Sequence, residues 1–349
     1  MIERDDLKAA VGSGLISEAQ AAGLASLADS RRGARQDLAA GDEPFELFRG
    51  FNEIFIVVGM VILAIGWGAI GVLFIEGGNY FSRTVAFAVA GAVLVWLLSE
   101  YFIRRRRMVA PAITLSILWS INASAGFSAE FSQPFMVAQQ DFSSLPLPLA
   151  LTTLSLVVYW FRFRVPFAMA MIALGAFGVA LVWASTTGGS PDSFEDLFLL
   201  SAGGRFAWIT LLIGLIVFGV AMAFDMSDPH RVTRRSANGF WLHVVAAPAL
   251  VNTLALTLLT GDAFALLAIV LGIFALIAVV IDRRSFLITA VGYCVTLAFT
   301  VFGGDGGAFT IFALGLALLL LGAFWEKLRS RLLRLLGPVL PLSRLPPSV

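Results

Sequence analysis

Residues 54–75 read IFIVVGMVILAIGWGAIGVLFI, and no charged side chain interrupts this run. A bilayer core about 30 Å thick requires about 20 apolar residues for a helix to cross it, so the run predicts a membrane-spanning helix. The whole chain of 349 residues has the same character, since 59% of it is hydrophobic and 13% is charged, against about 25% charged residues in soluble domains. This composition excludes a water-soluble protein and predicts a polytopic membrane protein.

Nine further segments meet the same criterion, so the sequence predicts an all-α polytopic transmembrane helical bundle of about ten spans. The predicted spans are 54–75, 84–103, 108–126, 146–163, 165–185, 206–225, 240–260, 263–281, 285–303 and 308–326. Pro146 and Pro148 shorten the fourth span. We retain it because Arg162 and Arg164 would otherwise lie across the membrane from Arg104–Arg107, against the positive-inside rule.

Basic residues separate the two sides of this topology. One side carries sixteen of them, namely Arg104, Arg105, Arg106, Arg107, Arg162, Arg164, Arg231, Arg234, Arg235, Arg283, Arg284, Lys327, Arg329, Arg331, Arg334 and Arg344. The other side carries Arg83 and Arg205 among acidic residues such as Glu130 and Asp192. The positive-inside rule makes the first side cytoplasmic. We therefore expect both termini in the cytoplasm and the bundle in a prokaryotic plasma (inner) membrane.

The chain divides into a cytoplasmic helical hairpin with a linker (1–41), an interfacial amphipathic helix (42–53), the ten-span bundle (54–326), and a basic amphipathic extension with a proline-rich tail (327–349). In the first region, Ser17 and Gln20 have the Ser-x-x-Gln spacing of a capping box at a helix start. In the second, phenylalanines recur three or four residues apart while Glu53 and other polar residues fill the remaining faces. That pattern is typical of a helix in the headgroup layer.

Two short motifs accompany this layout. The hairpin contains GLIS-x-x-Q (Gly14–Gln20), and an aromatic segment FRGFNEIF (Phe48–Phe55) leads into the first span. With the hairpin-like spans after it, the chain resembles bacterial "predicted membrane protein" families of unknown function. That resemblance implies a multi-span bundle and no particular activity. The ten-helix layout with both ends inside is also similar in topology to drug/metabolite-type transporters, which contain two inverted halves.

Several predicted spans end with an acid just inside the cytoplasmic boundary and a basic residue just outside it. These are Glu100 before Arg104–Arg107, Asp225 before Arg231, Asp282 before Arg283 and Arg284, and Glu326 before Lys327. Since each following span starts directly from the basic loop, the body has the pattern of repeated helical hairpins. A local ion pair, such as Glu100 with Arg104 at i, i+4, explains the acids simply. The alternative is proton or cation coupling at Glu100 or Asp225, which requires the acid to face a cavity.

Polar residues at membrane depth are the other functional candidates. They are Asn122 with its neighbours Ser120 and Ser124 in the third span, and His243 and Asn252 in the seventh. Pro248 lies between the last two and can kink the helix, and kinked helices often line transporter sites. These residues are therefore candidates for the lining of a cavity. Hydrogen bonding between helices is the simpler explanation, with His243 as a structural histidine near the cytoplasmic face.

The remaining patterns bear on partners and chemistry. Two clusters, Arg104–Arg107 and Arg329, Arg331 and Arg334, suit contacts with anionic lipid headgroups on the cytoplasmic side. With two histidines and one cysteine the chain offers few zinc ligands, and the sequence shows no catalytic constellation, so we expect no metal, cofactor, enzymatic activity or nucleic-acid partner. The sequence favours transport or flipping of a small molecule or lipid-like substrate. The alternative is a non-catalytic scaffold or accessory subunit that recruits a cytoplasmic or membrane protein through the N-terminal hairpin, and a membrane enzyme ranks third.

Overall fold

The computed structural model describes residues 4–17, 20–21, 24, 51–76, 79–139, 141–200, 204–229, 231, 233–286, 289–291, 293, 295, 312, 315–316, 319–320, 322–336 and 345–346. This described part of the chain is all-helical and contains no strand. The chain divides into two compact units, Met1–Phe45 and Glu46–Val349.

The N-terminal unit contains helix α1 (Arg4–Gly12), which is followed by Gly14 with a left-handed φ of +73°. Glycine adopts this conformation without steric cost, so it ends the helix. The predicted capping box comes next, because the Ser17 amide donates to Gln20 Oε1 at 2.9 Å and the Gln20 amide donates to Ser17 Oγ at 3.2 Å. The structure therefore confirms that a second helix starts here. The linker and the first nine residues of the predicted interfacial helix (42–50) lie outside the described residues.

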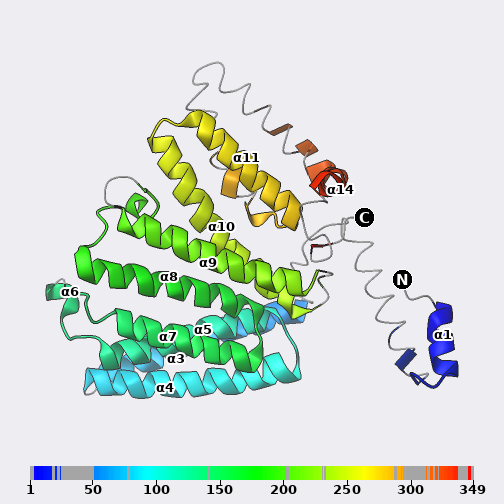
Figure 1. Ribbon diagram of the computed structural model, residues 1–349. Coiled ribbons are helices and arrows are strands. Elements are labelled where there is room, and N and C mark those ends of the chain that lie inside the picture. The colour runs from blue at the N-terminus through cyan, green and yellow to red at the C-terminus, as the bar shows by residue number, and fades with distance from the viewer. Residues whose placement is uncertain are drawn as a thin grey trace. The chain divides into compact units, whose positions relative to one another are not determined.

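Eight helices of the second unit are long and apolar enough to cross a membrane, counted within the part of the chain that the structure describes. They are α3 (Phe51–Glu76), α4 (Tyr80–Ser99) with its π-helical extension η1 (Glu100–Arg105), α5 (Ala110–Phe131), α7 (Pro146–Phe163), α8 (Pro166–Gly188), α9 (Arg205–Ser227), α10 (Arg234–Thr260) and α11 (Phe264–Ile281) (Figure 1). They correspond to the first eight predicted spans, so the chain is a multi-pass helical membrane protein. The predicted spans 285–303 and 308–326 lie largely outside the described residues.

The helices pack mostly against neighbours in the sequence. Helix α5 contacts α3, α4 and α7, α8 contacts α7, α9 and α10, and α10 contacts α9 and α11. In Figure 1, α7, α8 and α9 lie side by side. Short elements occupy the loops, namely α6 (Met136–Gln139) and η2 (Glu195–Leu197), and α14 (Trp325–Leu336) packs on α11.

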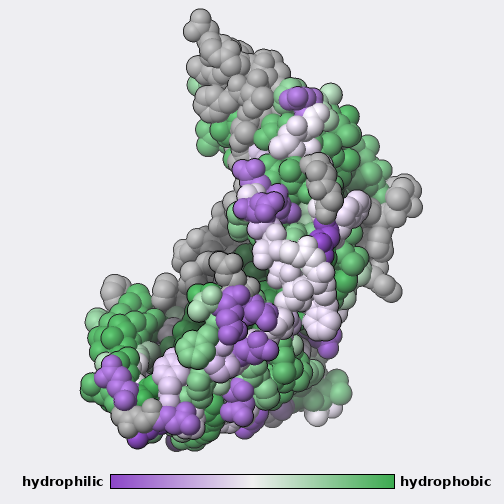
Figure 2. All heavy atoms as spheres, turned by 90° about the vertical axis from the view of Figure 1, so that its left-hand side faces the viewer, coloured by the Kyte–Doolittle hydropathy of each residue, from purple (hydrophilic) through white to green (hydrophobic). Residues whose placement is uncertain are grey.

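The sides of the helices are apolar, as lipid contact requires. Side chains such as Leu73 (75% exposed) and Ile65 (68% exposed) on α3 lie on the surface of the unit. Figure 2 looks onto the end of the helices that bears α6, where hydrophilic residues occupy the centre and apolar residues the flanks. Since lipid tails solvate apolar groups, such surfaces need no protein cover in a bilayer.

Small residues allow close helix contacts at particular positions rather than along whole faces. A Cβ atom added at Gly175 of α8 would lie 2.3 Å from Thr153 Oγ1 of α7, and one at Gly71 of α3 would lie 2.6 Å from the Phe87 ring of α4. By contrast, a Cβ added at Gly66 or Gly68 would meet no atom within 4 Å among the described residues. Gly71 and Gly175 therefore serve packing between neighbouring helices.

Helix α10 begins six residues earlier than hydropathy predicts, at Arg234 instead of residue 240. Thr233 caps it, since its Oγ1 accepts a hydrogen bond from the Arg235 amide at 3.2 Å. The added turn is polar in sequence, but its Ser236 and Asn238 are buried, at 5% and 6% exposure. Hydropathy excluded this turn because it registers polarity and not the tertiary contacts that satisfy polar groups.

A second capping contact joins distant segments. Glu53 at the start of α3 is only 5% exposed, and its Oε2 accepts a hydrogen bond from the Ala110 amide at 3.0 Å. Ala110 is the first residue of α5, where free amides and the helix dipole favour a carboxylate. The sequence pattern placed Glu53 on a polar face of an interfacial helix. In the structure it belongs to the first span and caps the third.

Candidate functional site

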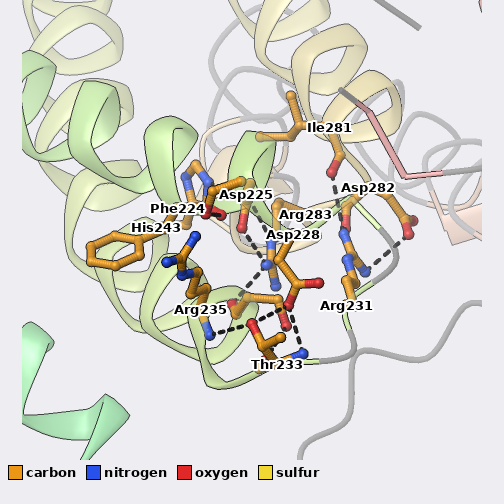
Figure 3. Close-up of polar contacts among 12 residues, drawn as sticks. Phe224, Asp225, Asp228, Arg231, Thr233, Arg235, His243, Ile281, Asp282 and Arg283 are labelled. Atoms are coloured by element: carbon orange, nitrogen blue, oxygen red, sulfur yellow. Dashed lines mark hydrogen bonds and ion pairs between the residues drawn. The ribbon is translucent and has the colours of Figure 1, made fainter. Parts of the chain in front are cut away.

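Two buried groups of opposite charge meet where α9 and α11 end and α10 begins. Asp225 in the last turn of α9 is 7% exposed, and Arg283, just after α11, is 2% exposed. The guanidinium binds the carboxylate through two hydrogen bonds, from Nε to Oδ2 at 3.0 Å and from Nη2 to Oδ1 at 2.6 Å (Figure 3). Nη2 also donates to the Ser236 carbonyl of α10 at 2.8 Å. A bidentate pair of this kind fixes both distance and orientation.

His243 of α10 completes this cluster. It is 0% exposed, and its Nε2 lies 2.9 Å from Asp225 Oδ2. An ionised carboxylate only accepts hydrogen bonds, so Nε2 carries the hydrogen and donates it. The other ring nitrogen, Nδ1, is buried and has no hydrogen-bond partner among the described residues. We call Asp225, His243, Arg283 and the Ser236 carbonyl the α9–α11 charge cluster.

A glycine makes room for the cluster. A Cβ atom added at Gly239 of α10 would lie 2.2 Å from Asp225 Oδ1 and 3.2 Å from the Ala221 carbonyl oxygen. Contacts that close do not occur in real structures, so any side chain here would push the carboxylate away from Arg283. Gly239 therefore lets α10 approach the acidic end of α9.

A second ion pair lies beside the cluster and connects the same two loops. Arg231, after α9, binds Asp282, at the end of α11, with 3.0 Å between Nη1 and Oδ2. Arg231 Nη2 also donates to the Asp282 carbonyl at 2.7 Å. Asp282 Oδ1 in turn accepts from Trp325 Nε1 of α14 at 2.8 Å. The loops after α9 and α11 are thus tied by two ion pairs.

The pairing is crosswise, because each ion pair joins the end of α9 to the end of α11. This corrects the expectation that each acid pairs with a basic residue near it in the sequence. The sequence pattern grouped Asp225 with Arg231 and Asp282 with Arg283, whereas the structure pairs Asp225 with Arg283 and Arg231 with Asp282. Consecutive side chains point in different directions, so Asp282 and Arg283 do not face each other. Asp282 also has a left-handed φ of 56°, which turns the chain at the end of α11.

The turn between α9 and α10 is closed by its own hydrogen bonds. Asp228 Oδ2 accepts from both the amide and the hydroxyl of Thr233, each at 2.7 Å. The positions of these residues are drawn in Figure 3. Because Thr233 also caps α10, this turn fixes where the helix that carries His243 begins.

The local pair predicted at Glu100 is confirmed. Glu100 Oε2 lies 3.0 Å from Arg104 Nη1, and Oε1 lies 2.7 Å from Arg162 Nη2 of α7. Glu100 is therefore shared by two helices, in a site where its side chain is 28% exposed. Arg104–Arg107 are all exposed. The Glu100 site is therefore more exposed to solvent than the α9–α11 charge cluster.

The residues that the sequence offered as candidates for a cavity lining have the following partners in the structure. Ser120, Asn122 and Ser124 of α5 hydrogen-bond to carbonyls of their own helix, those of Ile117, Leu118 and Ile121. The Oδ1 atom of Asn122 lies against Gly91 of α4, close to Trp67 Nε1 of α3. His243 instead faces Asp225 of α9, and Asn252 is half-buried in α10.

The two arginine clusters predicted to bind headgroups also differ. In α14, Arg331 and Arg334 are exposed, but Arg329 is 4% exposed and donates from Nη2 to the Pro346 carbonyl. Burial lowers the pKa of the Arg329 guanidinium from its ordinary value, and Asp282 and Glu326 oppose that change. Arg329 is thus covered by protein, whereas the basic amphipathic pattern grouped it with the arginines expected to contact lipid headgroups.

Sequence reasoning singled out Asp225 and His243 separately but missed Arg283 and Gly239 as their neighbours. A usable signal was the polar stretch RRSANG (234–239) at the start of an otherwise apolar helix, since buried polar groups require partners. Within the described residues no group of three or more His, Cys, Asp or Glu side chains is placed to hold a metal ion. The chain matches no protein-family model, and no curated protein and no solved structure matches it either.

Proposed function

We propose that this protein is a transporter that moves a small molecule or lipid-like substrate across the membrane, with the α9–α11 charge cluster as a gate at one end. The observation that carries the proposal is the buried Asp225–Arg283 pair, which His243 joins, at the ends of three apolar helices. Ionisable groups in membrane spans are costly, and they commonly mark transport pathways.

The electrostatics of the cluster suit a gate. A buried ion pair pays a desolvation cost that its mutual attraction roughly offsets, so its net contribution to stability is small. When α9 and α11 separate, Asp225 and Arg283 regain hydration, and the neighbouring pair of Arg231 and Asp282 does the same. Closed and open states can then lie within a few kcal/mol of each other, as switching requires.

The orientation of the protein in the membrane is part of the same proposal. Side-chain contacts join the arginine-bearing helix ends, since Glu100 binds Arg162 and Trp160 Nε1 donates to Asn238 Oδ1 at 3.4 Å. By the positive-inside rule this end is cytoplasmic, with both termini on that side of a prokaryotic plasma membrane. The turns after α4/η1, α7, α9 and α11 each contain a non-glycine residue with left-handed φ, namely Arg107, Arg164, Arg231 and Asp282. Repeated helical hairpins and the ten-span topology are part of the same proposal.

The gate is tested by the accessibility of Ala221, which lies one turn before Asp225 and is 0% exposed. The native Cys294 is first replaced with alanine, and Ala221→Cys is then treated in membrane vesicles with an impermeant thiol reagent from the arginine-rich side. We expect slow labelling that becomes at least about tenfold faster with Arg283→Gln, since each loss of about 1.4 kcal/mol from the closed state raises the open population tenfold.

Ala255→Cys is the matched control, because Ala255 is also 0% exposed but lies farther along α10. It should remain unlabelled in both backgrounds. Absence of labelling at position 221, or equal labelling at positions 221 and 255, contradicts the gate. A fluorescent phospholipid in proteoliposomes then separates the two substrate classes, because only a flippase exposes the inner-leaflet probe to an external quencher.

A second candidate function is a scaffold that recruits a protein through its N-terminal hairpin. The formed capping box at Ser17 and Gln20, in a compact unit separate from the bundle, favours it. Deleting residues 1–41 should then leave the thermal stability of the bundle unchanged and remove a specific co-purifying protein. Identical partners with and without residues 1–41 would count against recruitment.

A further inference from the structure

We propose that His243 is a proton-binding site, and that a proton on its Nδ1 displaces Arg283 from Asp225. This inference rests on the proposed gate and names its coupling ion. Two donors share one oxygen in the cluster, because Asp225 Oδ2 accepts from His243 Nε2 at 2.9 Å and from Arg283 Nε at 3.0 Å. While the His243 imidazole is neutral, the negative charge of Asp225 and the positive charge of Arg283 compensate each other.

The second nitrogen of His243 gives the proton a place to bind. Nδ1 has a lone pair in the tautomer that donates from Nε2, and it lacks a hydrogen-bond partner among the residues that the structure describes. The rings of Phe218 and Phe286 lie 5.5 and 5.8 Å from the imidazole, measured between centroids. Both rings meet the imidazole in a T-shaped geometry, with interplanar angles of 62° and 67°, and so line the site around it.

The surrounding charges determine how the cluster responds to protonation. Helices α8 and α11, which pack on α10, carry no ionisable side chain in their described sequences. Among the described residues, the charged groups of the cluster and the two turns beside it include Asp225 on α9, Asp228 and Arg231 in the next turn, and Asp282 and Arg283 after α11. Arg231 is held by Asp282, and Thr233 binds Asp228, so Asp225 is the anion that His243 contacts directly.

Protonation of His243 therefore leaves the Asp225 carboxylate beside two cations, the imidazolium and the Arg283 guanidinium, in a buried site. The imidazolium lies within α10 and cannot leave, whereas Arg283 lies in a loop beyond the end of α11. The guanidinium moves to water and Asp225 keeps the imidazolium as its partner. The proton goes from water to Nδ1, no covalent bond between heavy atoms changes, and the buried charge remains balanced. Loss of the Arg283 contacts to Asp225 and Ser236 releases α11 from α9 and α10.

The first test observes the proton directly. The chain has two histidines, so His230→Gln leaves His243 as the single imidazole for nitrogen NMR in lipid bilayers. At about pH 8 we expect a hydrogen on Nε2 and none on Nδ1, and as the pH is lowered to about 4, past the range of an ordinary imidazole, the Nδ1 resonance should shift as it gains a proton. An Nδ1 resonance that stays unchanged over this range overturns the proposal.

The second test observes the displacement. Spin labels at Ser227 on α9 and Lys327 on α14, both exposed, report the separation of the two loops in a Cys294→Ala background. The distance between them should lengthen at low pH. His243→Gln retains an N–H donor for Asp225 but binds no proton, so its distance should stay at the high-pH value throughout. Equal lengthening in this variant, or titration of Nδ1 without lengthening, refutes the coupling.

The two proposals fail separately. An unchanged Nδ1 with a reactive Ala221→Cys variant refutes the proton site and leaves the gate in place. An unreactive Ala221→Cys variant with no change in distance refutes the gate and the inference that rests on it.

Discussion

Arg283→Ala is expected to lower the free energy of unfolding by about 3–5 kcal/mol, because it leaves the Asp225 carboxylate buried without its cation. Asp225 is 7% exposed, and its two hydrogen bonds from Arg283 measure 2.6 and 3.0 Å. Only the His243 contact would remain to the carboxylate among the described residues. Thermal unfolding in detergent, followed by intrinsic tryptophan fluorescence, measures the loss.

Arg162→Ala is the matched control, since it also removes an arginine that bridges two helices. Arg162 and Glu100 have side chains that are 39% and 28% exposed, and water and Arg104 compensate Glu100 when Arg162 is absent. Half-exposed ion pairs contribute about 0–1 kcal/mol. Equal destabilisation by the two substitutions would show that the cluster at α9–α11 is no drier than the site at Glu100.

Gly239→Ala is expected to destabilise the bundle by about 1–3 kcal/mol through overpacking, although alanine favours a helix more than glycine does. The new Cβ would lie 2.2 Å from Asp225 Oδ1 and 3.2 Å from the Ala221 carbonyl oxygen. The carboxylate cannot move aside freely because Arg283 and His243 hold it. The same unfolding assay measures the effect.

Gly219→Ala in α9 tests whether steric contact is the cause. No atom of the described residues lies within 4 Å of a Cβ added there, so alanine should be neutral or stabilise by up to about 1 kcal/mol. If Gly239→Ala changed the stability as little as Gly219→Ala, the result would contradict the close approach of α10 to Asp225.

The sequence was sufficient to predict features that depend on nearby residues. The limits predicted for the fourth span, 146–163, coincide with α7, a span that was retained because of the positions of Arg162 and Arg164. The capping box at Ser17 and the pair of Glu100 with Arg104 join residues three or four apart. Helix geometry fixes such spacings, so they can be recognised in the sequence alone.

Features that depend on tertiary packing were not predictable in the same way. The choice of Arg283 over Arg231 by Asp225 depends on how α11 lies against α9 and α10. Likewise, the polar start of α10 is buried because partners from α7 and the loop after α11 satisfy Asn238 and the Ser236 carbonyl. No local pattern specifies which of several arginines reaches a given carboxylate.

The crosswise pairing is the central claim, and double-mutant cycles test it most directly. One cycle combines Asp225→Asn with Arg283→Gln, and the other combines Asp225→Asn with Arg231→Gln. Groups in direct contact couple by about 0.5–3 kcal/mol and separated groups add within about 0.5 kcal/mol. The structure predicts coupling of Asp225 to Arg283 in the first range and near-additivity with Arg231. Stronger coupling to Arg231 than to Arg283 would contradict it.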